Sequence, residues 1–241
     1  MTAFHMIELQ PDQKALIRFA QNQGFNKTRD EDMGYAAHAW LTALFGELAP
    51  KPFRLIQNGK GTLHLLGYST STRDVLAEAA RTFAVPSALA VCELEDKFHA
   101  KPMPASWPAG RRLGFEVLLC PVTRRDQMEK DVFLRRCDAL GEGQDAPARE
   151  EVYRNWLREQ MDGAATVEDS RMSSFRLVSL LRRGRGRAGA DRPAPRLNHP
   201  QALFSGILRV TDGAAFQGLL VRGIGRHRAF GFGMVLLRPA G

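Results

Sequence analysis

The amino-acid sequence predicts an α+β protein built from two tandem ferredoxin-like (RRM-like) domains, each with the element order β-α-β-β-α-β. Three observations predict this fold class. Short segments with alternating apolar residues are interleaved with segments of helical periodicity. The same order of elements occurs twice along the 241 residues, and a stretch rich in proline and glycine, residues 101–110, is typical of a linker between them. We therefore expect domains at residues 1–100 and 111–241.

The expected elements of the first domain follow one another with short connections. Residues 29–48 form the strongest predicted helix, with Asp and Glu in its first turn, which suits the positive end of the helix dipole. The sequence Asn-Gly-Lys-Gly between two alternating segments predicts a β-hairpin, and Thr72 is a suitable helix cap. In chain order we expect a strand at 2–9, helices at 11–25 and 29–48, strands at 51–57 and 62–69, a helix at 72–84 and a strand at 88–98.

The second domain is expected to repeat this order, although no sequence repeat relates the two halves. Its expected elements are a strand at 112–122, a helix at 146–161, strands at 173–183 and 202–212, a helix at 212–223 and a strand at 231–239. Residues 182–196, RRGRGRAGADRPAPR, contain six arginines. Such a composition cannot form a core element, so we expect a basic loop at the tip of a hairpin.

The charge distribution indicates a surface that binds a polyanion. Residues 1–100 carry a net charge of −1, whereas residues 101–241 carry +9. Basicity confined to one half of a chain is the electrostatic footprint of nucleic-acid binding. Many basic proteins bind no nucleic acid, so the charge leaves the ligand open.

Several other classes of protein are excluded by what the sequence lacks. The N-terminal residues do not have the pattern of a secretion signal, and no apolar segment is long enough to cross a membrane, so we expect a cytoplasmic protein. The three cysteines form no Cys-x-x-Cys pair, which argues against a disulfide framework or a zinc site. No pair of histidines, and no histidine with a carboxylate, has metal-ligand spacing. We therefore expect neither a metal nor a small-molecule cofactor.

The C-terminal segment GIGRHRAFGFGM, residues 223–234, combines glycines with cationic side chains. A nucleotide-binding loop has its glycines after a strand and before a helix, whereas here a helix precedes them and a strand follows. Two alternatives remain. In the first, the glycines only permit close packing of the backbone. In the second, the phosphates of a nucleic acid approach and are bound by this stretch; the residues concerned are Arg226, His227, Arg228, Gly231 and Gly233.

Tyr35 and His38 are the candidate catalytic residues. They stand three positions apart on the strongest predicted helix, so both side chains leave the same face. A histidine changes its charge near neutral pH and can donate or accept a proton in catalysis. A lone helical histidine is nevertheless more often structural, so these two residues alone leave the role of His38 open.

The glycine-rich segment, at the end of a tandem ferredoxin-like chain, resembles the signature of the RAMP superfamily of CRISPR proteins. Three further features are similar to the CasE family, the CRISPR-repeat endoribonuclease of the type I-E Cascade complex: the strand TAFHMIEL, the Tyr-x-x-His sequence at 35–38, and FSGILRVTD at 204–212. The resemblance covers essentially the whole chain. It implies that His38 is the catalytic histidine and Tyr35 its partner.

The resemblance also implies the substrate and the partners. The expected reaction is metal-independent cleavage of precursor CRISPR RNA at the base of the repeat hairpin, by attack of the ribose 2′-hydroxyl. The crRNA 3′ hairpin is then expected to stay bound, beside a Cascade backbone subunit. Candidate RNA-binding residues in the basic loop are Arg182, Arg183, Arg185 and Arg187. The alternative is a non-catalytic subunit that binds the RNA hairpin, in which His38 is structural, and the choice between acid and base for His38 stays open.

Overall fold

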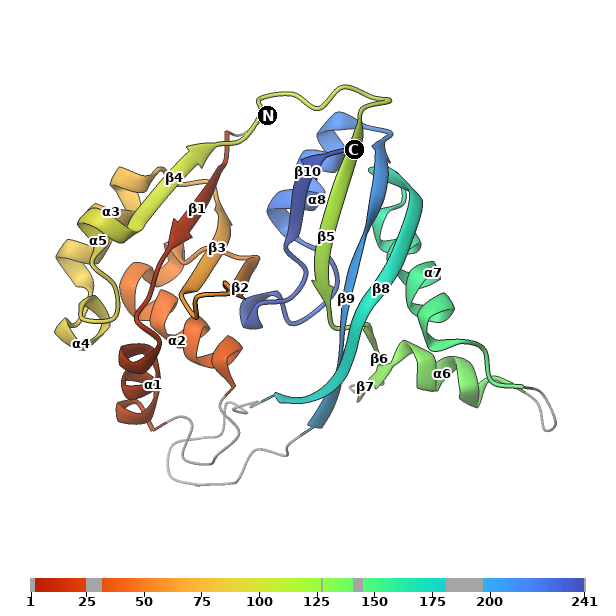
Figure 1. The fold of residues 1–241 in the computed structure, drawn as a ribbon, viewed down its shortest axis with the longest axis horizontal. Coiled ribbons are helices and arrows are strands. Elements are labelled where there is room, and N and C mark those ends of the chain that lie inside the picture. Colours follow the sequence, from red (N-terminus) through yellow and green to blue (C-terminus); the bar gives the residue numbers. More distant parts are fainter. Residues whose placement is uncertain (1–2, 25–31, 127, 141–144, 181–196, 241) are drawn as a thin grey trace.

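The structure, a computed structural model, describes residues 3–24, 32–126, 128–140, 145–180 and 197–240. These parts of the chain form two four-stranded antiparallel sheets, with helices packed against each (Figure 1). The strand orders are β2-β3-β1-β4 and β10-β5-β9-β8. In each sheet the first strand of that half of the chain has a central position: β1 lies between β3 and β4, and β5 lies between β9 and β10. This is the ferredoxin-like arrangement, and it confirms the predicted α+β fold class.

The helices of the N-terminal half pack against one face of its sheet. Alternate strand residues, including Ile7, Leu9 and Leu65, are fully buried and pack with Trp40 and Leu76 of the helices into one core. The strands are β1 (His5–Leu9), β2 (Phe53–Gln57), β3 (Leu63–Ser69) and β4 (Phe98–Pro102), and the main helices are α1 (Gln13–Asn22), α2 (Met33–Phe45) and α3 (Arg73–Phe83).

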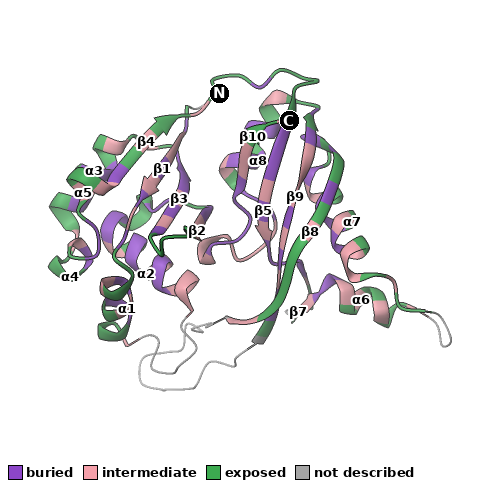
Figure 2. Cartoon of the chain, in the orientation of Figure 1, coloured by how far each residue is buried: buried purple, intermediate pink, exposed green. Residues whose placement is uncertain are grey.

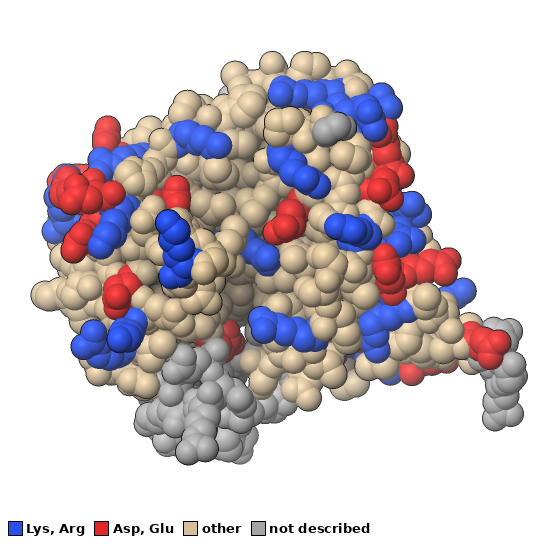
Figure 3. All heavy atoms as spheres, in the orientation of Figure 1, with Lys and Arg blue, Asp and Glu red and all other residues tan. Residues whose placement is uncertain are grey.

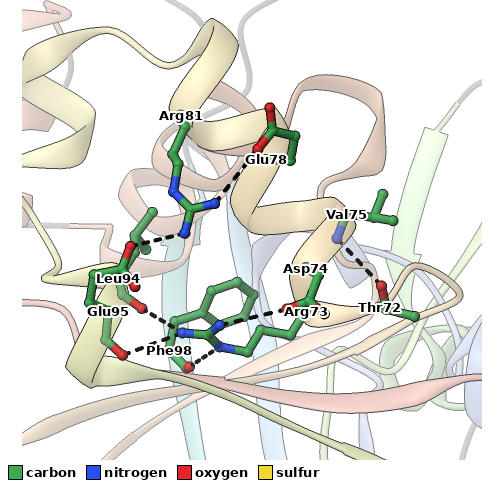
Figure 4. A network of polar contacts seen from close by, with 9 residues as sticks. All are labelled: Thr72, Arg73, Asp74, Val75, Glu78, Arg81, Leu94, Glu95 and Phe98. Atoms are coloured by element: carbon green, nitrogen blue, oxygen red, sulfur yellow. Dashed lines mark hydrogen bonds and ion pairs between the residues drawn. The ribbon is translucent and has the colours of Figure 1, made fainter.

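The strand predicted at residues 88–98 is wrong. This segment forms two short helices, α4 (Pro86–Leu89) and α5 (Leu94–Lys97), before β4 begins at Phe98. The Arg73 side chain holds this turn in place by donating hydrogen bonds to the carbonyls of Phe98, Leu94 and Glu95 (Figure 4). The predicted cap at Thr72 is confirmed, because its hydroxyl accepts a hydrogen bond from the amide of Val75.

The start of α2 also differs from the prediction. The helix begins at Met33, so its first turn contains no acidic residue. Instead Asp32 is the N-cap, and its carboxylate accepts a hydrogen bond of 2.9 Å from the amide of Tyr35. Capping by a carboxylate satisfies an amide that the helix itself leaves without a partner. This cap fixes the first turn of α2, from which the Tyr35 side chain projects.

The C-terminal sheet contains the longest strands. β8 and β9 pair over their whole length, from Ala165 with Val210 to Leu180 with Leu197, and two bulges interrupt β8. The predicted basic loop, residues 182–196, lies outside the described residues. The strands are β5 (Arg112–Leu119), β8 (Ala165–Leu180), β9 (Leu197–Val210) and β10 (Val235–Pro239), and the packed helices are α7 (Arg149–Met161) and α8 (Gly213–Arg222).

One small unit was not predicted from the sequence. A second hairpin, β6 (Val122–Arg125) and β7 (Met128–Asp131), leads into α6 (Val132–Asp138). The buried carboxylate of Asp131 accepts hydrogen bonds from the α6 amide of Phe133 and from the side chains of Arg149 and Tyr153. The hairpin sequence is short and polar, so apolar periodicity does not reveal it.

The two halves contact each other directly. The Tyr68 hydroxyl of β3 donates a hydrogen bond of 2.8 Å to the carbonyl of Val235 in β10, and Phe4 and Tyr68 belong to the core of the C-terminal half. Figure 2 shows buried residues along both sheets. Trp107 of the connecting segment is buried against Phe216. β4 extends to Pro102, two residues into the predicted linker, and the domain division at 101–110 stays a prediction.

Nowhere in the described parts of the chain does a helix have both the length and the apolar character that a membrane crossing requires.

Candidate active site between the two halves

The structure brings the candidate catalytic residues of α2 against the glycine-rich turn, residues 223–234. The Tyr35 and His38 side chains are both partly exposed. Phe230 of the turn stacks on Tyr35 with ring centroids 5.8 Å apart and meets the edge of His38 at 5.5 Å. A histidine from the first half of the chain therefore lies beside the motif from the end of the second half.

Close contact between backbones makes this docking possible. A Cβ atom built on Gly34, in the first turn of α2, would lie 2.3 Å from the carbonyl oxygen of Phe230. No real side-chain carbon tolerates that distance, so the turn can approach α2 this closely because residue 34 is glycine. The position of Phe230 against Tyr35 and His38 therefore depends on a residue that has no side chain.

The environment of His38 favours the neutral imidazole. Partial burial lowers the pKa of His38 below its ordinary value of 6.5, and the positive charge of Lys51 lowers this pKa further. Both effects disfavour the imidazolium ion. At neutral pH the free protein therefore presents an imidazole that can accept a proton, which suits a general base.

We expect an NMR titration of the RNA-free protein to give His38 a pKa below 6.5. Lys51→Gln should raise the His38 pKa, because the variant removes a neighbouring positive charge. Lys60→Gln, in the β2–β3 turn, is the matched control and should leave the His38 pKa unchanged. A pKa above the ordinary value would contradict this assignment of the His38 environment.

The cationic residues of the glycine-rich turn are held by protein groups. Arg226 and His227 both contact the buried carboxylate of Glu129 in β7, with Arg226 Nε at 2.9 Å and His227 Nε2 at 2.8 Å. Burial raises the pKa of Glu129, but the contacts with His227 and Arg226 lower it by more, so the net shift is downward and the carboxylate stays charged. Arg228 donates instead to the carbonyl of Arg222 at the end of α8. RNA binding by these three residues stays a prediction.

The glycines of the turn allow backbone conformations and close packing that a side chain would prevent. Gly231 and Gly233 are buried and have positive φ angles of 88° and 77°. A Cβ atom on Gly233 would lie 2.2 Å from the carbonyl oxygen of Ile224, while the Gly233 amide donates to the carbonyl of Leu118. These observations support the packing alternative for both glycines, and RNA contacts by them stay a prediction.

A cleft of about 700 Å³ opens beside this site, between the start of α2, the neighbouring ends of β8 and β9, and the glycine-rich turn. Its lining is mixed. The polar side chains are Asp32, Arg176, Ser179, Asn198 and Gln201, and the apolar ones are Met33, Leu55, Leu118, Leu177, Val178, Phe230 and Phe232. The predicted RNA-binding arginines Arg182, Arg183, Arg185 and Arg187 lie outside the described residues. Figure 3 shows Lys and Arg side chains spread over both halves of one face, with acidic side chains between them.

Sequence reasoning missed three residues of the site. Phe230 lies inside the glycine-rich segment, but nothing in the segment indicates that it contacts α2. Glu129 stands in a polar hairpin 98 residues before its partner His227, and Lys51 is the first residue of a predicted strand. Only Phe230 carried a signal, because an aromatic residue between glycines is unusual in a loop that merely turns the chain.

The chain has two ferredoxin-like sheets, and the glycine-rich turn of the second half docks beside a histidine on a helix of the first. The protein is therefore a tandem ferredoxin-like protein with a candidate site between its halves. The chain belongs to the family of CRISPR-associated proteins, whose sequence profile matches residues 4–239. This match confirms the predicted relationship to CRISPR proteins. None of the curated protein sequences compared with the chain matches it.

Solved structures with the same fold are similar over nearly the whole chain. The CRISPR endoribonuclease Cse3 bound to 19-nt RNA has a TM-score of 0.64 and 18% identity, covering 98% of this chain and 100% of Cse3. Thermus thermophilus Cse3, bound to an RNA representing a pre-cleavage complex, has a TM-score of 0.62 and 17% identity, with coverages of 98% and 100%. Cas6e from Escherichia coli K-12 has a TM-score of 0.56 and 16% identity, with the same coverages. At these identities the likeness shows the shared fold.

Proposed function

We propose that the protein is a metal-independent endoribonuclease that cleaves precursor CRISPR RNA at the base of the repeat hairpin. The observation that carries this proposal is the position of His38. A partly buried imidazole with a lowered pKa lies against the glycine-rich turn, at the junction of the two halves. The family membership and the fold shared with RNA-bound Cse3 support the choice of substrate.

The chemistry uses a nucleophile that RNA itself carries. His38 removes the proton of a ribose 2′-hydroxyl, whose oxygen forms a bond to the adjacent phosphorus. The bond from phosphorus to the 5′-oxygen of the next nucleotide breaks, and that oxygen takes up a proton from solvent water and leaves as a 5′-hydroxyl. The upstream product ends in a 2′,3′-cyclic phosphate. General base catalysis of this kind contributes about 10²–10⁴-fold.

Two neighbours of His38 have supporting roles in the proposed reaction. The charge of Lys51 already acts on His38, and an ammonium group at this place stabilises the negative charge that develops on the phosphorane. The Tyr35 ring, held by stacking on Phe230, orients the 2′-hydroxyl or donates to a phosphate oxygen. The reaction needs the flanking nucleotides to be splayed for in-line attack.

The rest of the RNA is held by charge and shape. A-form RNA hides its base edges, so proteins recognise it through phosphates and geometry. The net charge of +9 beyond residue 100 and the arginines of residues 182–187 supply the phosphate contacts. The cleft beside Phe230, lined by both polar and apolar side chains, suits an unpaired nucleotide next to the cleavage site. We propose that the crRNA 3′ hairpin stays bound and that the chain joins a Cascade backbone subunit, because the CRISPR RNA-guided surveillance complex contains a chain of this fold (TM-score 0.55, 16% identity, coverages 98% and 100%).

The test is to incubate the protein with a repeat hairpin in EDTA and to determine the chemistry of the product ends. We expect cleavage to persist and to give a 5′-hydroxyl and a 2′,3′-cyclic phosphate, because no water or metal-bound hydroxide attacks the phosphorus. The melting temperature of the protein is recorded in the same buffer, so that loss of catalysis is distinguished from loss of folded protein.

The matched control is a hairpin with one 2′-deoxyribose at the nucleotide before the scissile phosphate. It keeps the shape and the phosphates but lacks the nucleophile, so it should bind and remain intact. Cleavage of the deoxy substrate, or a 3′-hydroxyl product end, would contradict the mechanism. Tight binding of the all-ribose hairpin without any cleavage would support the non-catalytic RNA-binding alternative instead.

A further inference from the structure

We propose that Cys120, His199 and His227 form a binding site for one transition-metal ion of the Zn²⁺ type. The potential ligand atoms of these three residues all lie within 4.8 Å of one another. The residues come from three segments: Cys120 directly follows β5, His199 lies in β9, and His227 lies in the glycine-rich turn. This inference is independent of the proposed ribonuclease function.

The geometry and the donor atoms suit such an ion. Zinc binds cysteine sulfur at about 2.3 Å and histidine nitrogen at about 2.0–2.1 Å, so tetrahedral ligand atoms stand about 3.3–3.6 Å apart. Since the ligand atoms lie within 4.8 Å of one another, a closure of at most about 1.5 Å brings the cluster to that spacing. Thiolate and imidazole ligands select zinc-like metals over magnesium or calcium, which prefer oxygen.

Two of the three residues are buried and the third is only slightly exposed. Cys120 is 2% exposed and His199 5% exposed, and the His227 side chain is 10% exposed. The two imidazole rings lie with centroids 4.7 Å apart and planes inclined by 58°. The two rings and the thiol leave the remaining tetrahedral position for a water molecule, as in zinc sites with three protein ligands.

Glu129 completes the arrangement from outside the ligand set. Its carboxylate, 2% exposed, contacts Nε2 of His227 at 2.8 Å. Histidines that bind metals commonly donate their second ring nitrogen to a carboxylate, which fixes the ring orientation and increases its basicity. A metal bound through Nδ1 of His227 keeps the Glu129 contact in place.

The position of the cluster indicates what the ion does. It ties together the end of β5, the start of β9 and the glycine-rich turn. The His227 ring lies 6.0 Å from Phe230, which in turn contacts Tyr35 and His38. The ion therefore fixes the turn that contains Phe230. The Phe230 ring in turn contacts both His227, a proposed ligand, and His38.

The experiment measures binding of Co²⁺, a spectroscopic substitute for Zn²⁺, to the full-length protein. We expect one Co²⁺ per chain, with the charge-transfer absorption of a thiolate ligand and the visible bands of tetrahedral coordination, and displacement of Co²⁺ by Zn²⁺. Cys120→Ser should abolish the charge-transfer band, and Glu129→Gln should weaken binding by about 10–100-fold. Cys92→Ser, which removes another buried thiol, is the matched control and should bind Co²⁺ like the wild type.

Circular dichroism shows whether each variant is folded, and His199→Gln is the second ligand variant if Cys120→Ser does not fold. The proposal is overturned if folded wild-type protein binds no Co²⁺, or if Cys120→Ser and Cys92→Ser retain the same thiolate absorption. Ribonuclease activity of a protein that binds no Co²⁺ would overturn this proposal and leave the proposed function intact. Stoichiometric Co²⁺ binding without cleavage of any repeat RNA would support the metal site and overturn the proposed ribonuclease function.

Discussion

His38→Ala should reduce the single-turnover cleavage of a repeat hairpin by about 10²–10⁴-fold, while the dissociation constant for uncut RNA changes little. The reason is that alanine removes the proton acceptor without removing a phosphate-binding charge, since the lowered pKa keeps the imidazole neutral at pH 7. The measurement combines cleavage rates at saturating protein with a binding isotherm for the 2′-deoxy hairpin.

The control for this variant is His99→Ala. His99 lies exposed in β4, on the N-terminal sheet, so its removal should leave both cleavage and binding unchanged. Unaltered cleavage by His38→Ala would show that His38 is not the proton acceptor of the reaction. A melting temperature within the range of the wild type excludes unfolding as the cause of a loss.

Gly34→Ala should destabilise the protein by about 1–3 kcal/mol, the usual cost of overpacking, and should reduce cleavage strongly. An alanine normally stabilises a helix relative to glycine by roughly 0.5–1 kcal/mol. Here its Cβ atom would stand 2.3 Å from the Phe230 carbonyl oxygen, so either α2 or the glycine-rich turn must move. The measurements are chemical denaturation and the cleavage rate.

Gly218→Ala provides the matched control, because Gly218 lies in α8 with no atom within 4 Å of an added Cβ. We expect it to stabilise the protein by roughly 0.5–1 kcal/mol and to leave cleavage unchanged. Equal stabilisation by both substitutions would show that the turn does not dock on α2 as described. Destabilisation by Gly34→Ala with full activity would show that Phe230 has no part in placing His38.

Apolar periodicity was sufficient for most of the fold. In FSGILRVTD the apolar residues Phe204, Leu208 and Val210 are separated by even numbers of positions, so they share one face of the strand, and all three are buried. Asp212 caps α8 by accepting a hydrogen bond from the amide of Ala215. Both signals are local, because strand alternation and helix capping involve neighbouring residues. The prediction failed at residues 88–98, where a short apolar run has no distinct period and Arg73, from another element, stabilises tight turns.

Only part of the candidate site could be predicted from local sequence patterns. Tyr35 and His38 lie on one helix, so their common face follows from their spacing. The spacing of Arg226 and His227, the predicted phosphate ligands, does not reveal their partner. In the structure both contact Glu129, a residue nearly a hundred positions earlier. The same holds for Cys120 and His199, whose sequence neighbourhoods contain no metal-binding motif.

Local patterns in the chain thus specify its class: the order of strands and helices, the imbalance of charge, and the helix face that carries Tyr35 and His38. Long-range packing specifies which of these features meet: Phe230 with His38, Glu129 with the turn, and the thiol of Cys120 with two imidazoles. The physical reason is the range of the forces. Periodicity and capping act over a few residues, whereas the contacts between distant segments arise only when buried surfaces of both sheets exclude water together.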